Sequence, residues 1–308
     1  MDTLLELVML LVVLGAVYGL VLWAHKGATD RSAHVGLYLL YGIPGALLTV
    51  AGLALSVNGQ DNGWFILALG LSLSLPLVKP FRRLLAAVTP MDPASTVDMM
   101  GLGLILALMS YFGWAITLET DPEDLTSAVT VASQVINVAF FILVAYVAVG
   151  TSIYRNGREA TARLGIRWPS LPDIAVGVAA VIPAFMLSVL GSLLTLYFQP
   201  DLFDDLGATM EEMSSGTEVT LLSVLIFASA GLGEEILFRG AIQPRFGIVL
   251  TSAFWALVHT QYQLSFVVLG LFLVGLLFGL MRKYVSTTSA IIAHALYNAA
   301  VVLLQAYG

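Results

Sequence analysis

Long apolar runs follow one another along this chain, separated by short polar breaks. The hydrocarbon core of a bilayer is roughly 30 Å thick, so a spanning helix needs about 20 residues of this kind. The pattern predicts about ten helical spans, of which the third and the eighth are short. The expected spans are residues 3–24, 35–57, 64–78, 97–118, 128–152, 173–199, 219–238, 246–262, 264–281 and 287–306.

The predicted fold class is all-α, a polytopic integral membrane helix bundle of about 8–10 transmembrane helices, with kinked or short helices around the functional residues. Composition agrees, since 59% of the 308 residues are hydrophobic and 11% are charged. These values exclude a soluble domain and make the lipid bilayer the chain's surroundings. We expect no nucleic-acid partner. The absence of cysteine excludes disulfides, thiolate metal sites and a cysteine nucleophile.

The charged residues alternate in sign from one polar break to the next. All 13 basic residues fall in every second break: Lys26, Arg31, Lys79, Arg82, Arg83, Arg155, Arg158, Arg163, Arg167, Arg239, Arg245, Arg282 and Lys283. The other breaks carry acidic residues: Asp61, Glu119, Asp121, Glu123, Asp124, Asp201, Asp204, Asp205, Glu211, Glu212 and Glu218. Because basic loops stay in the cytoplasm, we expect a multi-pass protein of the cell membrane with both termini outside.

One long polar connection divides the chain. Residues 154–172 are rich in arginine and contain proline, which is typical of a cytoplasmic linker at the membrane surface. We therefore predict an N-terminal membrane region of about five spans at residues 1–153, whose role no motif indicates. A second membrane domain is expected at residues 173–308, with all the candidate functional residues between 219 and 306.

Two adjacent glutamates, Glu234 and Glu235, lie inside the expected span 219–238. Each charge near the middle of a membrane helix costs roughly 2.5–3.5 kcal/mol, so such a pair indicates function. Glu235 and Arg239 are four residues apart, the spacing of a helical ion pair, whereas Glu234 points about 100° away. The spacing predicts a structural Glu235–Arg239 pair and leaves Glu234 for chemistry.

Three more polar residues lie in the last spans: His259, His294 and Asn298. His294 and Asn298 are one turn apart and share a helix face. Peptide hydrolysis needs a base that activates water and donors that hold the oxyanion. Glu234 with His259 can supply the base, and His294 with Asn298 can supply the donors. Alternatively, Glu234, His259 and His294 could bind zinc, although the chain has no HExxH motif.

Three motifs in the sequence resemble those of a known protein family. GEEILFRG at 233–240, WALVH at 255–259 and HALYN at 294–298 resemble, in order, the EExxxR, FxxxH and HxxxN/D motifs of the CPBP family. That family contains intramembrane proteases related to the type II CAAX prenyl endopeptidases and to bacteriocin-immunity (Abi) proteins. Trp255 departs from the usual phenylalanine but keeps an aromatic side chain for packing.

The resemblance implies an intramembrane endopeptidase that acts on a membrane-associated protein or peptide, with prenylated CAAX-like proteins as one candidate class. It implies that Glu234 activates water, that His259 assists, and that His294 and Asn298 form the oxyanion hole. Supporting positions would be Glu235 and Arg239. Family members have been described both as metalloproteases and as metal-free glutamate proteases. We favour the metal-free mechanism, with no cofactor, and keep zinc as the alternative.

Two other functions fit parts of the pattern. An ion-coupled transporter could use the buried carboxylates, but no repeat of two halves is visible in the sequence. A non-catalytic immunity or scaffold protein could keep the motifs for stability alone. Variants that lose catalysis but still support the protein's function in cells would favour the non-catalytic immunity or scaffold role.

The depth of His259 needs explanation. At 1.5 Å per residue, Glu234 and His294 lie ~8 and ~10 Å from the cytoplasmic ends of their helices, but His259 lies ~20 Å from Arg245 in a straight helix. Residues at such different distances from the membrane surface cannot form one site. We therefore predict that the chain after Arg239 first runs along the interface or in a cavity, or that span 246–262 is short and tilted. The GLLFG segment at 275–279 is expected to pack closely on a neighbouring helix.

Overall fold

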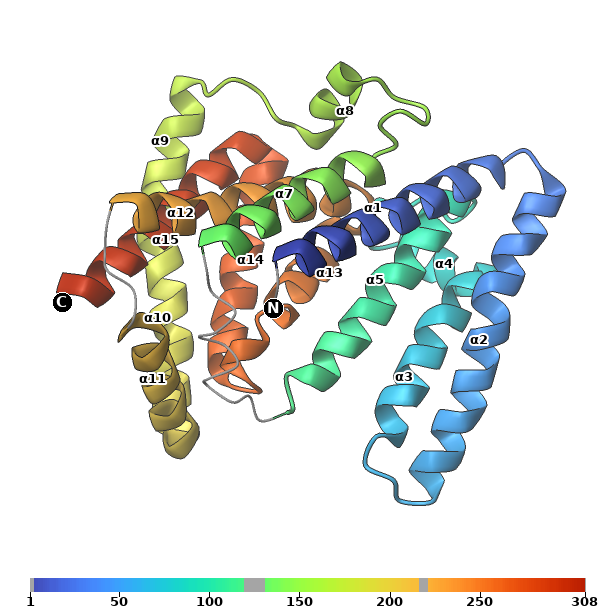
Figure 1. Ribbon diagram of the computed structural model, residues 1–308, viewed down its shortest axis with the longest axis horizontal. Coiled ribbons are helices and arrows are strands. Elements are labelled where there is room, and N and C mark those ends of the chain that lie inside the picture. Colours follow the sequence, from blue (N-terminus) through green and yellow to red (C-terminus); the bar gives the residue numbers. More distant parts are fainter. Residues whose placement is uncertain (1–2, 119–130, 216–220, 308) are drawn as a thin grey trace. The chain divides into compact units, whose positions relative to one another are not determined.

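A computed structural model describes residues 3–118, 131–215 and 221–307, which are helical almost throughout (Figure 1). Within these ranges there is no β-strand, apart from an isolated bridge between Thr151 and Arg155. The predicted all-α class is therefore confirmed. Part of the acidic pattern lies outside the described residues or on side chains that are not described: Glu119, Asp121, Glu123, Asp124, Glu211, Glu212 and Glu218.

The chain forms two compact units. The first unit contains residues 18–118 and 244–247, and the second contains residues 1–17, 119–243 and 248–308. The linker 154–172 lies inside the second unit and does not separate the two. Residues 131–153, expected in the N-terminal region, therefore belong to the same unit as the motifs.

In the first unit, two close antiparallel helices pack against a third. Its elements are the end of α1 (Thr3–Lys26), α2 (Arg31–Val57), α3 (Gly63–Ser74), η1 (Leu75–Leu77), α4 (Lys79–Ala86) and α5 (Thr96–Ala115). A Cβ at Gly52 would lie 2.2 Å from the backbone nitrogen of Leu67, so only glycine allows α2 to approach α3 this closely. Pro76 lies in η1, where the chain bends by 86° between α3 and α4.

The second unit has α12 near its centre, where it contacts both α7 and α15. Around these helices, α10 packs on α14, and α9 packs on α15. The elements are α7 (Val131–Ala148), α8 (Gly157–Leu164), α9 (Leu171–Ala179), α10 (Val181–Phe198), α11 (Pro200–Ser215), α12 (Leu221–Glu235), η2 (Ile236–Ile242), α13 (Gln243–Leu257), η3 (Thr260–Tyr262), α14 (Phe266–Tyr284) and α15 (Thr287–Tyr307).

Six helical stretches in the described ranges are long and apolar enough to cross a membrane: Leu7–Lys26, Arg31–Val57, Thr96–Ala115, Leu171–Phe198, Phe266–Tyr284 and Thr287–Leu304. The bent pair α3 and α4 makes seven if it counts as one span. The expected span 219–238 corresponds to α12 and the first part of η2, and the expected span 246–262 corresponds to most of α13 and to η3. The glutamate motif therefore lies at the junction of α12 and η2, WALVH lies at the end of α13, and HALYN lies within α15.

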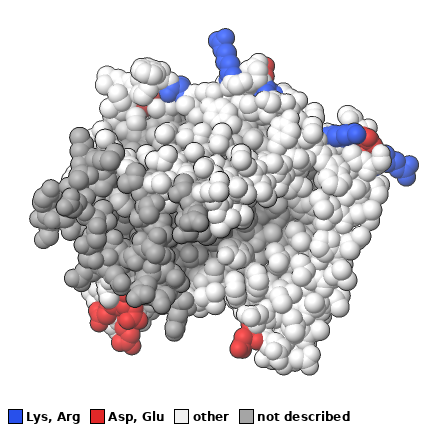
Figure 2. Space-filling view, in the orientation of Figure 1, with Lys and Arg blue, Asp and Glu red and all other residues white. Residues whose placement is uncertain are grey.

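Charges of opposite sign lie at the two ends of the α9–α10 segment of the second unit. The basic linker 154–172 precedes α9, and α11, with Asp201, Asp204 and Asp205, follows α10. Figure 2 shows Lys and Arg side chains at the upper edge of the drawn face, the region of α8, and Asp and Glu side chains at the lower left, the region of α11. The alternation expected from the sequence is therefore present along this segment.

Candidate active site

The glutamate motif lies where an α-helix changes into a π-helix. Glu234 and Glu235 end α12, and the next seven residues, Ile236–Ile242, form the π-helix η2 with Arg239 at its centre. All seven residues are buried. A π-helix has wider turns with i→i+5 hydrogen bonds, and such segments occur frequently at functional sites. No sequence signal predicted this change of helix type.

Glu235 uses both carboxylate oxygens inside the protein. Oε2 lies 3.2 Å from Nε of Arg239, and Oε1 accepts a hydrogen bond of 2.9 Å from Nδ1 of His294. The side chains of Glu235 and Arg239 are fully buried. The predicted ion pair is therefore present, and it includes His294 as a third member. Because its side chain is fully buried and its charge is paired with Arg239, Glu235 is not placed to take a proton from water.

Several groups fix Arg239 in place. Its guanidinium lies over the ring of Trp255, 4.9 Å from the centroid, and one of its nitrogens donates to the carbonyl of Gly275 at 3.3 Å. Gln243 donates in the same way to the carbonyl of Gly279 at 2.8 Å. The GLLFG segment thus packs closely, as expected, and it also presents backbone carbonyls to η2 and α13. Sequence reasoning missed Gln243, because its role depends on the π-helix.

Glu234 has a different environment from its neighbour. Its Oε2 accepts a hydrogen bond of 2.6 Å from the indole nitrogen of Trp255. The side chain is partly exposed, in contrast to Glu235. Trp255 was expected to be a packing aromatic only, but a buried indole N–H needs a hydrogen-bond acceptor, and that requirement is the signal that could have revealed its role. Its bond to Oε2 leaves Oε1 as the oxygen that can accept a proton.

His259 also contacts Trp255. Its Nδ1 donates to the carbonyl of Trp255 at 2.8 Å, and the two rings are 4.8 Å apart. Trp255 therefore bonds both Glu234 and His259 and links the two residues. The predicted short helix is present, since α13 ends at Leu257 after 15 residues and is broken at Gly247, whose φ is 81°. With Nδ1–H used, Nε2 of His259 is the nitrogen that can accept a proton.

His294 and Asn298 lie on α15 but have different partners. His294 is buried, with its ring 5.6 Å from that of Trp255, whereas the amide nitrogen of Asn298 donates to the carbonyl of Phe227 at 3.2 Å. Phe227 is two helical turns before Glu234, roughly 10 Å along α12. The structure thus brings His294 into the cluster. Asn298 lies about one helical turn beyond His294 on α15, at the contact between α12 and α15. Its oxyanion role stays a prediction.

The alternative metal set was tested against the geometry. Within residues 3–118, 131–215 and 221–307, no group of three or more His, Cys, Asp or Glu side chains is arranged to hold a metal ion. The Nδ1 atoms of His259 and His294 are taken by a carbonyl and by Glu235, and Glu234 is bonded to Trp255. These bonds leave Nε2 of His259, Nε2 of His294 and Oε1 of Glu234 as the atoms that would hold a zinc ion in the alternative mechanism. The steps derived below follow the metal-free mechanism.

Two neighbouring elements support the motif helices. A Cβ at Gly233 would lie 3.2 Å from the Cβ of Phe141 on α7, and the ring of Phe141 lies 6.4 Å from that of Phe238. On the other flank, Arg163 of α8 donates to the carbonyl of Gly240 at 3.3 Å. Thus α7 and α8, both before residue 173, belong to the framework of the site.

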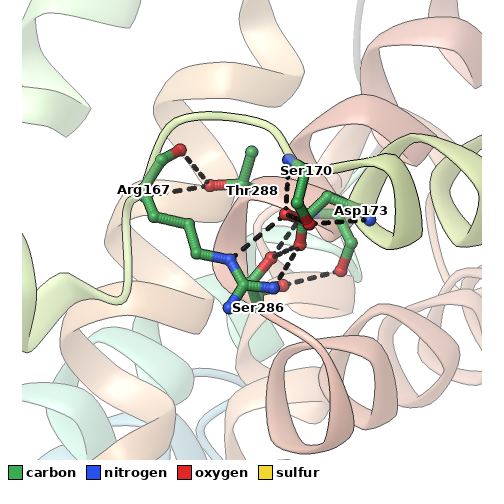
Figure 3. A network of polar contacts seen from close by, with 6 residues as sticks. Arg167, Ser170, Asp173, Ser286 and Thr288 are labelled. Carbon is green, nitrogen blue, oxygen red and sulfur yellow. Dashed lines mark hydrogen bonds and ion pairs between the residues drawn. The ribbon is translucent and has the colours of Figure 1, made fainter.

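A polar network joins the basic linker to the turn that precedes α15 (Figure 3). The guanidinium of Arg167 forms two hydrogen bonds with the carboxylate of Asp173, at 2.8 and 3.1 Å, which raise the pKa of Arg167. Asp173 also accepts from Ser170 and Ser286, both at 2.5 Å, and Thr288 bonds the backbone of Arg167. The network fixes the start of α15, the helix that carries His294.

A comparison with known families identifies this region. The family model of the Rce1-like type II CAAX prenyl endopeptidases matches residues 216–300. The match covers η2 and every residue of the cluster from Glu234 to Asn298, and it confirms the resemblance seen in the three motifs. No curated protein and no solved structure matches the chain. The Rce1-like match supports a CAAX-type intramembrane endopeptidase in general, with a peptide substrate and a membrane setting.

Proposed function

We propose that the protein is an intramembrane endopeptidase in which Glu234 activates the water that hydrolyses a peptide bond. The observation that carries the proposal is the unequal environment of the two glutamates. Glu235 is fully buried and paired with Arg239 and His294, whereas Glu234 is partly exposed and is held through one oxygen by Trp255, which also bonds His259. A general base needs this combination of fixed position and an oxygen able to accept a proton.

The reaction follows from these positions. Oε1 of Glu234 takes a proton from water as the water oxygen attacks the carbonyl carbon, which forms a tetrahedral oxyanion. The C–N bond then breaks, and the proton passes to the leaving amine from Glu234 or through Nε2 of His259. The products are a carboxylate and an amine. No cofactor enters this sequence of steps.

His294 can stabilise the oxyanion only in its charged form. Its Nδ1–H is used by Glu235, so an N–H at Nε2 requires an imidazolium. Asn298, whose amide has a second N–H besides the one bonded to Phe227, is the proposed additional donor.

The substrate we propose is a membrane-associated protein or peptide, with prenylated CAAX-like proteins as one candidate class. For the orientation, we propose that the basic linker faces the cytoplasm of the cell membrane, so that both termini lie outside. Positive charge close to membrane helices favours the cytoplasmic side.

The decisive test is Glu234→Gln. We expect loss of hydrolysis by at least ~100-fold, the size of a general-base contribution, with normal insertion and folding. Mass spectrometry of membrane peptides from cells with the intact protein or the variant would reveal the cleaved substrate. The matched control, Glu235→Gln, breaks the buried ion pair and should lower stability by about 3–5 kcal/mol. Cleavage retained by Glu234→Gln would contradict the proposal.

Chelation tests the metal-free mechanism separately. Purified protein treated with a strong zinc chelator and then dialysed should keep its full hydrolytic rate, because the proposed base, Glu234, acts on water directly. The control is a zinc protease treated in parallel. Activity that disappears on chelation and returns with zinc would show that the zinc alternative is correct.

A further inference from the structure

A cavity of about 230 Å³ lies in the second unit, and one of its lining residues, Tyr262, contacts the ring of His259. It is formed by α10, α11, η3, α14 and α15. Pockets for drug-sized ligands measure roughly 300–1,000 Å³, so this cavity is smaller than such pockets. Its size suits one amino-acid side chain rather than a long lipid chain.

Two tyrosines connect the cavity to the candidate catalytic residues. Tyr262 stacks near His259, with ring centroids 6.5 Å apart and planes inclined by 22°. Tyr297 directly precedes Asn298 and donates or accepts a hydrogen bond of 2.8 Å with Ser188 on α10. Both tyrosines line the cavity. The contact between Tyr262 and His259 therefore joins the cavity to the candidate catalytic residues.

The loop that carries Tyr262 is held in an unusual conformation. Gln263 has a φ of 45° and a ψ of −161°, a region that residues other than glycine rarely occupy. Gln199 fixes this loop from α10, since its amide donates to the carbonyl of Leu264 at 3.1 Å and accepts from the nitrogen of Phe266 at 3.3 Å. Backbone strain of this kind clusters at binding and catalytic sites.

The cavity lining combines apolar side chains with hydroxyl groups. Phe203, Leu206 and Leu271 give apolar surface, and hydroxyls come from Ser188, Ser192, Tyr262 and Tyr297. The described lining side chains include no charged group. A charged occupant would lose its hydration without gaining a counter-ion, which is costly. A neutral side chain with an apolar body is the occupant that this lining accepts.

We propose that this cavity is the specificity pocket for a neutral, largely apolar side chain of the substrate residue next to the scissile bond. The proposal rests on the proposed function and extends it to substrate selection. Successive Cα atoms are 3.8 Å apart, so a peptide bond held at Glu234 and His259 has a flanking side chain within reach of Tyr262. Ser192 and Phe203 would then set the size of the side chain that fits.

Two substitutions with opposite effects test the pocket. The probe is a library of quenched fluorescent peptides that carry every residue type at the two positions flanking one peptide bond, assayed in proteoliposomes. Ser192→Phe fills the cavity and should shift the kcat/KM preference toward smaller residues by about tenfold or more. Phe203→Ala enlarges it and should shift the preference toward larger residues. Val189→Phe, an equally bulky change at an exposed position of α10, should change nothing.

The outcomes separate this inference from the proposed function. Cleavage that depends on Glu234 but has the same profile in all variants would overturn the pocket and leave the protease intact. A preference for Asp, Glu, Lys or Arg at both positions would also overturn it. Cleavage that survives Glu234→Gln would contradict the proposed function itself. If Ser192→Phe fails to insert into the membrane, Phe203→Ala tests the pocket alone: a kcat/KM preference shifted toward larger residues supports it, and an unchanged or opposite preference overturns it.

Discussion

At the scale of single residues, Trp255 explains how two neighbouring glutamates acquire different tasks. Its indole nitrogen holds Glu234, its backbone carbonyl holds His259, and its ring covers Arg239, the partner of Glu235. One side chain thus links the proposed base to the structural ion pair. A hydrogen bond to a charged group contributes roughly 1.5–3 kcal/mol, so this link should matter for catalysis.

We therefore expect Trp255→Phe to reduce kcat by about tenfold and to lower the free energy of unfolding by roughly 1.5–3 kcal/mol, because a hydrogen bond to a charged group is lost at a fully buried position. Phenylalanine keeps an aromatic face over Arg239 but cannot donate to Glu234, so Glu234 is held less firmly. The reduction should be partial, because the motif that this chain resembles usually has phenylalanine here. Steady-state kinetics and thermal unfolding of the same preparations would measure both effects. Unchanged kcat would show that the Trp255 hydrogen bond is dispensable.

At the scale of elements, the site depends on how short helices are joined. The π-helix η2 connects α12 to α13 without a loop, and α13 is broken at Gly247 before it reaches Trp255, which bonds Glu234. On the other side, a Cβ at Gly231 would lie 3.0 Å from the nitrogen of Ala295, so α15 approaches α12 closely enough for His294 to reach Glu235. The network of Asp173 then fixes where α15 begins.

For that network we predict that Asp173→Asn lowers the Tm by about 2–4 °C while the folded enzyme remains active. The amide keeps the size of the carboxylate but loses the charge that pairs with Arg167 and accepts from Ser286. Arg158→Ala, at an exposed position of α8, is the matched control and should leave the Tm unchanged. A large loss of activity in the folded variant would instead assign Asp173 a part in catalysis.

At the scale of the whole molecule, charge determines how the helices insert. All the basic residues lie in every second polar break, and the charged residues in the breaks between these are all acidic. Such a distribution sets orientation during insertion through the lysines and arginines, whereas acidic residues contribute little. The proposal that the basic side is cytoplasmic follows for the whole chain from this pattern.

Because the chain has no cysteine, single cysteines report orientation directly. We expect Asp61→Cys to react with a membrane-impermeant maleimide added to intact cells, and Arg158→Cys to react only after the membrane is opened. Both positions are exposed. The unsubstituted protein, which has no thiol, gives the background. The reverse labelling pattern would invert the proposed topology.

Much of the candidate site could be predicted from the sequence because helical spacing is local. The pairing of Glu235 with Arg239 follows from four residues of separation, and the different direction of Glu234 follows from the same geometry. The Trp255 hydrogen bond, by contrast, joins residues 21 positions apart on two helices. No periodicity within one helix encodes such a contact.

The sequence by itself determined the all-α membrane class, the charge alternation, the Glu235–Arg239 pair and the three motifs, because each depends on composition or on neighbours within one helix. Only the tertiary structure decided the π-helix, the bond from His294 to Glu235, the place of Asn298 beside Phe227, and the membership of α7 and α8 in the second unit. These features arise from packing between helices, where close approach and the satisfaction of buried polar groups select one arrangement among many that the local pattern allows.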